Sequence, residues 1–224
     1  MWDSLPMYAG GALVTLQLLG LALALGLAAA FPLAVLRSLP SAWAWRPVWA
    51  FTYVIRGTPL LVQLFLLYYG LAQFEAVRAS PFWPWLRSPW FRAVTAFALN
   101  TCAYTTEILH GAMKAVPAGE VEAARAIGMG RWLTFRRIVL PSACRRSLPA
   151  YSNDVVLILH RTALASVVTL HDLTGVAREV NSIHYLPFEA FITAALCYLA
   201  ITVVLVGAFH LAERRWLRPL SNRA

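Results

Sequence analysis

Polar side chains at helical spacing interrupt one long apolar run of this chain. Asn100, Tyr104, Glu107 and Gly111 follow one another at intervals of four, three and four residues. This spacing puts all of them on one face of a helix, which predicts that the face meets water or protein rather than lipid. Asp154 opens a later apolar run, and the rise of a helix puts it at a depth similar to that of Glu107. Two carboxylates at matching depth predict a site for a cationic group.

A structural alternative is that Glu107 pairs with Arg161 and joins two helices, while Asp154 is a solvated carboxylate at the membrane surface. Ionisable groups are costly in lipid, which favours a functional role for both. No nucleophile or acid–base pair accompanies them. Neither a disulfide framework nor a metal-ligand set can be built from the widely spaced cysteines Cys102, Cys144 and Cys197. The sequence therefore predicts a binding site with no catalytic group and no metal.

The elements that hold these residues are predicted to be membrane-spanning helices. The 224 residues are 60% hydrophobic and 13% charged, with a mean hydropathy of +0.63, which is too apolar for an ordinary soluble domain. Residues 11–36 carry no charge and exceed the roughly 20 residues that cross a bilayer as a helix. Thr58 and Pro59 predict a helix start after a break, with Thr58 as the cap. About five spans are expected in all, the others near residues 59–74, 91–113, 150–170 and 189–211.

The basic residues predict the orientation of these spans. An outside N-terminus puts fourteen of the nineteen Lys and Arg residues on the cytoplasmic side and four outside, with Arg161 inside a span. This asymmetry satisfies the positive-inside rule. The net charge of +9 is therefore interpreted as a topology signal and not as a nucleic-acid surface. The prediction is an N-terminus outside, a C-terminus inside and a cytoplasmic segment at about residues 117–143.

This cytoplasmic segment is predicted to form two short helices joined by a glycine elbow. Pro117 suits the first turn of a helix, and Gly128 and Gly130 end that helix. The second helix is expected to end at Leu140–Pro141. Alanines in the first helix leave its backbone open to close approach by another protein. An amphipathic helix lying on lipid is the plainer alternative.

The spacing of residues in the segment favours the docking interpretation. Glu122-Ala123-Ala124 is followed by three residues, Gly128, nine residues, Ile138, one residue and Leu140-Pro141. This pattern resembles the EAA loop of the inner-membrane permease subunits of ATP-binding-cassette (ABC) importers. Two further stretches resemble the polar amino-acid permeases, and in particular the M subunit of the histidine and lysine/arginine/ornithine type. They are Arg56-Gly57-Thr58-Pro59-Leu60 with Gln63, and residues 99–107 with residues 148–153.

The resemblance implies an all-α integral membrane protein with the fold of ABC type I importer permeases, and a single transmembrane domain over residues 1–224. It implies a multi-pass subunit of the bacterial inner (cytoplasmic) membrane that imports polar, and specifically basic, amino acids such as histidine, arginine, lysine and ornithine. The EAA loop would dock into an ATPase through Glu120, Glu122, Ala123, Ala124, Arg125 and Gly128. Substrate would be held by Asn100, Thr101, Tyr104, Glu107, Asp154, His160, Arg161 and Thr162. Arg161 departs from the pattern expected of the family, because it brings a cation close to this site.

The partners implied are two ATPase subunits, a second permease subunit that is identical or a Q-type paralogue, and a solute-binding protein outside the membrane. The only lysine, Lys114, lies between Met113 and Ala115, so the Gly-Lys-Ser/Thr of a phosphate-binding loop is absent. The chain is therefore expected to bind no cofactor, with ATP and Mg²⁺ on the partner ATPase. Two competing classes are a lipid-modifying membrane enzyme and an uncoupled amino-acid transporter.

Overall fold

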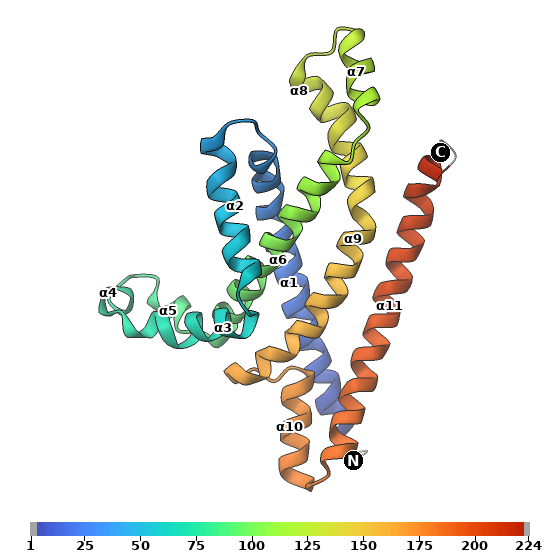
Figure 1. The fold of residues 1–224 in the computed structure, drawn as a ribbon. Helices are drawn as coiled ribbons and strands as arrows, with labels where there is room; N and C mark the ends of the chain where they lie inside the picture. The colour runs from blue at the N-terminus through green and yellow to red at the C-terminus, as the bar shows by residue number, and fades with distance from the viewer. Residues whose placement is uncertain (1–3, 222–224) are drawn as a thin grey trace.

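The computed structural model describes residues 4–221, and all regular secondary structure in that range is helical. Figure 1 shows long helices running side by side, with a helical hairpin projecting at one end. In chain order the elements are α1 (Leu5–Arg37), α2 (Ala42–Gly57), α3 (Leu60–Phe65), η2 (Leu66–Gly70), η3 (Leu71–Gln73), α4 (Glu75–Arg78), α5 (Trp83–Leu86), α6 (Pro89–Lys114), α7 (Ala118–Ala126), α8 (Arg131–Thr134), η4 (Phe135–Val139), α9 (Leu140–Arg161), η5 (Thr162–Val168), α10 (Leu173–His184) and α11 (Pro187–Ser221).

Two helices, α1 and α11, are long and apolar enough to cross a membrane, and two bent helix pairs raise the number of candidate spans to four. The bent pairs are α2 with the helix that follows it and α9 with α10. Helix α6 has 26 residues, which is long enough at 1.5 Å per residue, but it is more polar. It packs against α1, α2 and α9, so its polar side chains are shielded by protein rather than exposed to lipid.

The chain bends by 101° between α2 and α3, where the sequence predicted a break. Pro59 disfavours a helical conformation at the residue before it, and Thr58 is extended with φ −112° and ψ 143°. The expectation that Thr58 caps α3 is wrong, because Pro59 is the N-cap residue and the Thr58 hydroxyl donates back to the Val54 carbonyl at 2.9 Å. Gln63 stabilises the bend by donating from Nε2 to the Ile55 carbonyl at 2.7 Å.

The second helix of the cytoplasmic segment does not end at Leu140–Pro141 as expected. Helices α8, η4 and α9 run on without a break from Arg131 to Arg161. A π-helical turn at Phe135–Val139 changes the hydrogen-bond register just before Pro141, whose missing N–H then falls in the first turn of α9. The loop is therefore joined rigidly to the helix that carries Asp154.

The fourth predicted span, residues 150–170, differs from the structure at both ends. The α-helix stops at Arg161, tightens into the 3₁₀-helix η5 and ends at Thr169, which has a φ of 64°. Helix α10 follows at 48° to the preceding helix and was not predicted. Its N-cap residue Asp172 accepts hydrogen bonds from the backbone N–H of Gly175 at 3.1 Å and from the Tyr198 hydroxyl at 3.0 Å.

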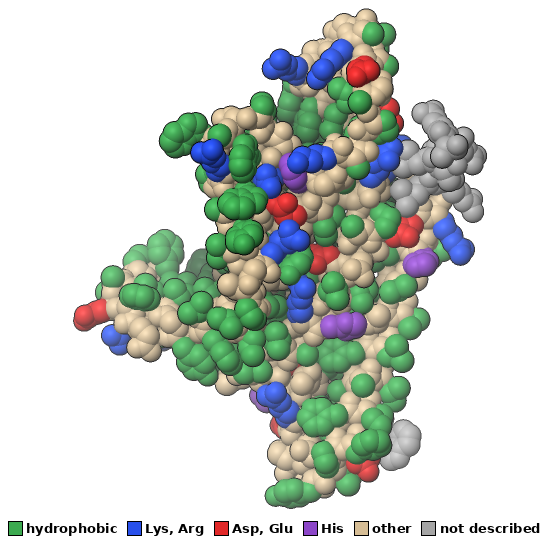
Figure 2. Space-filling view, viewed as in Figure 1, with side chains coloured by type: hydrophobic (Ala, Val, Ile, Leu, Met, Phe, Trp, Pro, Cys, Tyr) green, Lys and Arg blue, Asp and Glu red, His purple; other side chains and the backbone are tan. Residues whose placement is uncertain are grey.

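Helix α1 packs closely along α6 because small residues let the two helices approach. A Cβ on Gly26 would lie 2.7 Å from the Thr101 side chain on α6, so only glycine fits at this contact. Leu18, Phe97 and Val168 then join α1, α6 and η5 in one fully buried cluster. Figure 2 shows hydrophobic side chains over much of the visible surface and basic side chains gathered on the half that carries α7 and α8.

Candidate functional site

The projecting hairpin of α7 and α8 is held by a glycine-dependent cap. Gly128 has a φ of +81° and follows the last turn of α7. Its N–H donates to the Arg125 carbonyl at 2.9 Å, and the Met129 N–H donates to the Ala124 carbonyl at 3.0 Å. These two bonds form a Schellman motif, which satisfies carbonyls at the helix end and favours glycine at the left-handed position. Gly128 therefore sets the angle between the two helices of the predicted glycine elbow.

The predicted docking residues do not share one environment on this hairpin. Glu122, Ala123 and Arg125 are exposed on α7, and Glu120 is half-buried in its first turn. Ala124 is only 3% exposed, so its side chain packs within the chain instead of facing outward as expected. Helix α7 folds back against η4, and this contact accounts for the burial of Ala124.

Two large apolar side chains at the tip of the hairpin were not among the predicted docking residues. Ile127 is 79% exposed and Trp132 is 69% exposed, although Trp132 stacks on Phe135 with ring centroids 5.8 Å apart. A signal was present in the sequence, because Ile127 directly precedes the glycine that ends a polar helix. Exposed apolar groups beside small residues suit contact with another protein.

Inside the bundle, Arg161 gathers two of the predicted substrate residues. Its guanidinium donates to Asn100 Oδ1 at 2.9 Å and lies over the Tyr104 ring, 4.7 Å from the centroid. Arg56 on α2 also lies over this ring, at 5.1 Å. Asn100 is buried, whereas Tyr104 and Arg161 are half-buried. Two guanidinium groups therefore lie over one aromatic ring, that of Tyr104 on α6.

Asp154 lies close to this group but has no hydrogen-bond partner. Its side chain is 3% exposed, and both carboxylate oxygens are unpartnered among the described residues. Arg161 and Arg56 are the cations near enough to act on it, but neither lies within the 4.0 Å of an ion pair. A buried carboxylate without partners costs stability, and such a group in a bundle interior marks a place for a cation.

Glu107 does not pair with Arg161, and the structure gives it other partners. Arg37 Nε donates to Glu107 Oε1 at 3.2 Å, and the Thr52 hydroxyl donates to the same oxygen at 2.7 Å. Glu107 lies seven residues beyond Asn100, or about 10 Å along the helix, so Arg161 cannot reach both. Its carboxylate joins α1, α2 and α6, which favours a structural role over a substrate contact.

Three more predicted substrate residues face away from this group. Thr101 and Thr162 are both fully buried, Thr101 against Gly26 and Thr162 with its hydroxyl donating to the Leu159 carbonyl at 2.6 Å. His160 is exposed and approaches Thr202 of α11 at 3.4 Å. Consecutive helical residues point about 100° apart, which separates His160 and Thr162 from Arg161. The structure therefore does not bring Thr101, His160 and Thr162 into the group around Arg161.

Within residues 4–221, no group of three or more His, Cys, Asp or Glu side chains is placed to hold a metal ion. One charged group inside the bundle is instead formed by Asp154, Arg161 and Arg56, with no ion pair between the carboxylate and either arginine. This arrangement offers a negative and a positive group side by side, which suits a ligand that carries both signs.

Comparison with known proteins gives the family of the chain. Residues 18–218 match the family described as binding-protein-dependent transport system inner membrane component. The chain is 47% identical over 218 residues to the histidine/lysine/arginine/ornithine transport system permease protein HisM of Salmonella typhimurium, covering 95% of this chain and 91% of that one. It is 44% identical over 218 residues to the nopaline transport system permease protein NocM of Agrobacterium fabrum, covering 97% and 90%.

Solved structures agree with this assignment. An amino acid ABC transporter crystallised with histidines aligns with a TM-score of 0.86 and 33% identity, covering 96% of each chain. The MetNI methionine ABC transporter in an inward-facing conformation aligns with a TM-score of 0.79 at 17% identity, covering 97% and 98%, which speaks for the fold alone. The chain belongs to the family of binding-protein-dependent transport system inner membrane components and has its all-helical permease fold.

Proposed function

We propose that this chain is the permease subunit of an ATP-driven importer for basic amino acids, of the histidine, lysine, arginine and ornithine class. The observation that carries the substrate class is Asp154, a buried carboxylate with no partner beside two arginines. Identity of 47% to a permease named for these amino acids supports the same class. The whole of residues 1–224 acts as one transmembrane domain.

The proposed orientation has an outside N-terminus, an inside C-terminus and five spans. These are α1, α2 with α3, α6, α9 with α10, and α11. The basic side chains seen on the half with α7 and α8 support a cytoplasmic position for that half (Figure 2). Helix α6 counts as a span because its neighbours shield its polar face.

Coupling to ATP is proposed to run through the α7–α8 hairpin. Ile127 would enter an apolar site on the ATPase, with Glu122 and Arg125 at the edge of the contact. ATP binding would move the docked ATPase and the hairpin with it. The unbroken helix from Arg131 to Arg161 supports transmission of this movement from the hairpin to the residues around Asp154. Because no Gly-Lys-Ser/Thr is present, ATP and Mg²⁺ would bind on two partner ATPase subunits and not on this chain.

The substrate contacts are proposed to be fewer than the sequence suggested. Asp154 would receive the cationic side chain or amino group, and Arg161 and Arg56 would receive the α-carboxylate. Tyr104 and Asn100 would hold Arg161 in place. Alternating access follows if a second permease subunit, identical or paralogous, closes the other side of this site. A solute-binding protein would deliver the substrate from outside.

The experiment is co-purification of the ATPase with the affinity-tagged chain from membranes that contain all subunits. Ile127→Asp should abolish recovery of the ATPase, since it puts a charge into the proposed apolar contact. Ile183→Asp is the matched control, because Ile183 is also exposed, at 56%, but lies on α10 at the other end of the molecule. Equal recovery with both variants would refute docking through the hairpin.

A further inference from the structure

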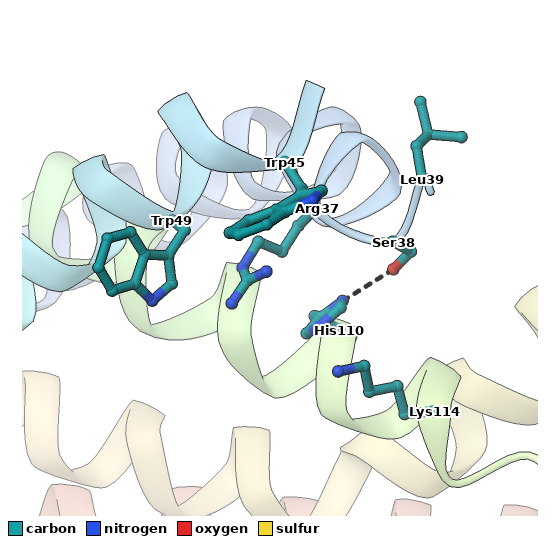
Figure 3. Close-up of a pocket in the computed structure, with 7 residues that line it drawn as sticks. All are labelled: Arg37, Ser38, Leu39, Trp45, Trp49, His110 and Lys114. Carbon is teal, nitrogen blue, oxygen red and sulfur yellow. Dashed lines mark hydrogen bonds between the residues drawn. The ribbon is translucent and has the colours of Figure 1, made fainter. Parts of the chain in front are cut away.

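A pocket lies at the cytoplasmic end of the bundle as oriented above. Its volume is about 490 Å³, and it opens where α1 and α6 end beside α2. Figure 3 shows Arg37, His110 and Lys114 facing it, with the rings of Trp45 and Trp49 along one side. The residues that line it include no carboxylate. It is therefore a cationic pocket with an apolar wall.

The charges of this pocket are not fully neutralised by the chain. Arg37 donates to Glu107 through Nε alone, and its two terminal nitrogens have no partner among the described residues. Lys114 is exposed, and no carboxylate in the described part of the chain lies within 4.0 Å of its ammonium. The Arg37 guanidinium lies 5.5 Å from the centroid of Trp45, which keeps it at the pocket wall. An anion is the ligand that these groups favour.

His110 gives an independent indication of a ligand. Its side chain is 6% exposed, and Nδ1 lies 2.9 Å from the Ser38 hydroxyl, as Figure 3 shows. In the tautomer in which Nδ1 accepts from the Ser38 hydroxyl, Nε2 carries the ring proton and is a hydrogen-bond donor. The other ring nitrogen, Nε2, is buried with no partner among residues 4–221. Buried polar atoms normally have a partner, and an unpartnered one lining a pocket points to a bound group.

We propose that this pocket binds the phosphate-bearing headgroup of an anionic phospholipid from the cytoplasmic leaflet. The proposal rests on the orientation given under the proposed function. Basic pockets between transmembrane helices on the cytoplasmic side are sites for such headgroups. Trp43 is 92% exposed and Trp49 is 44% exposed on the same helix, as expected of rings at the membrane surface. A free phosphate ion would gain nothing from these indole rings, whereas a lipid glycerol backbone would pack on them.

Lipid binding can be measured separately from transport. The permease is purified with its bound subunits, stripped of lipid in detergent and titrated with dioleoyl phosphatidylglycerol or dioleoyl phosphatidylcholine, and bound lipids are counted by native mass spectrometry. Phosphatidylglycerol should bind and phosphatidylcholine should not compete. Lys114→Gln should weaken phosphatidylglycerol binding about fivefold, the usual effect of one lysine near an anionic membrane surface. Arg78→Gln, which removes an exposed cation on α4, should leave binding unchanged.

Three results would overturn the proposal. The first is equal binding of the two lipids by the unmodified protein, a comparison that depends on no variant. The second is equal loss of binding in Lys114→Gln and Arg78→Gln. The third is displacement of phosphatidylglycerol by excess inorganic phosphate, which would identify the ligand as a free anion. Because ATPase recovery is not measured here, failure of this proposal leaves the docking experiment unaffected.

Discussion

Gly128 allows a quantitative test of the α7–α8 hairpin. Its φ of +81° lies in the left-handed region, where a residue with a Cβ is strained by about 1–2 kcal/mol. A Cβ built on Gly128 meets no atom within 4 Å, so Gly128→Ala changes only the backbone preference and adds no clash. We expect the free hairpin of the variant to relax and lose its Schellman cap. Docking must then restore the strained form. The strain of about 1–2 kcal/mol corresponds to a factor of about 5–30 in the dissociation constant for the ATPase.

The assay is titration of fluorescently labelled ATPase against the permease in lipid nanodiscs. Gly128→Ala should raise the dissociation constant about five- to thirtyfold, and Gly128→Asn should raise it less because asparagine tolerates the left-handed region. Gly130→Ser is the matched control, since Gly130 lies in the same loop with a φ of −63° and serine is a favoured N-cap residue. An unchanged constant for Gly128→Ala, or an equal loss for Gly130→Ser, would refute the reasoning.

Three further variants test the interior of the bundle by thermal unfolding in detergent and by uptake. Asp154→Asn should raise the free energy of unfolding by on the order of 1 kcal/mol, because it removes a buried unpartnered charge, and should abolish arginine uptake. Glu107→Gln should cost about 1 kcal/mol through the half-buried pair with Arg37, and should lower uptake of arginine and glutamine alike. Gly26→Ala should cost about 1–3 kcal/mol by overpacking, whereas Gly20→Ala, with open space around its Cβ, should be neutral or slightly stabilising.

Each of these variants has a result that would count against the structure. A less stable Asp154→Asn would mean that the carboxylate has a partner in the assembled transporter, and Asp172→Ala, which removes a bonded helix cap, sets the scale for that loss. Selective loss of arginine uptake in Glu107→Gln would indicate that Glu107 contacts the substrate. Equal unfolding temperatures for the two glycine variants would contradict the close approach of α1 to α6.

The local features of the fold were predictable because their causes are local. A run of apolar residues identified α1 and α11, and the positions of Pro117 and Gly128 identified the start of α7 and the turn after it. Helix α10 was missed, since its residues are neither apolar enough for a span nor marked by a strong cap apart from Asp172. Pro141 predicts the end of a helix, but a π-helical turn beside it lets the helix continue.

The candidate site was harder to predict because it depends on how helices rotate against one another. The sequence predicts one substrate site for Asn100, Tyr104, Asp154 and Arg161, and the structure puts Asn100 and Tyr104 in contact with the Arg161 guanidinium. Glu107 was assigned to the same site on depth and face alone, yet its partner Arg37 is 70 residues away in sequence. Sequence spacing gives the face of a helix but not the neighbour that packs against it.

The most direct test of the central claim is ATP-driven uptake into proteoliposomes that contain this permease, its ATPase, its second permease subunit and its binding protein. With ATP enclosed, radiolabelled arginine should accumulate above the external concentration, and glutamine should accumulate far less. Glu122→Lys, on the exposed face of α7, should abolish the ATP-dependent part. Equal accumulation with and without ATP, or full ATP-dependent uptake by Glu122→Lys, would contradict the account.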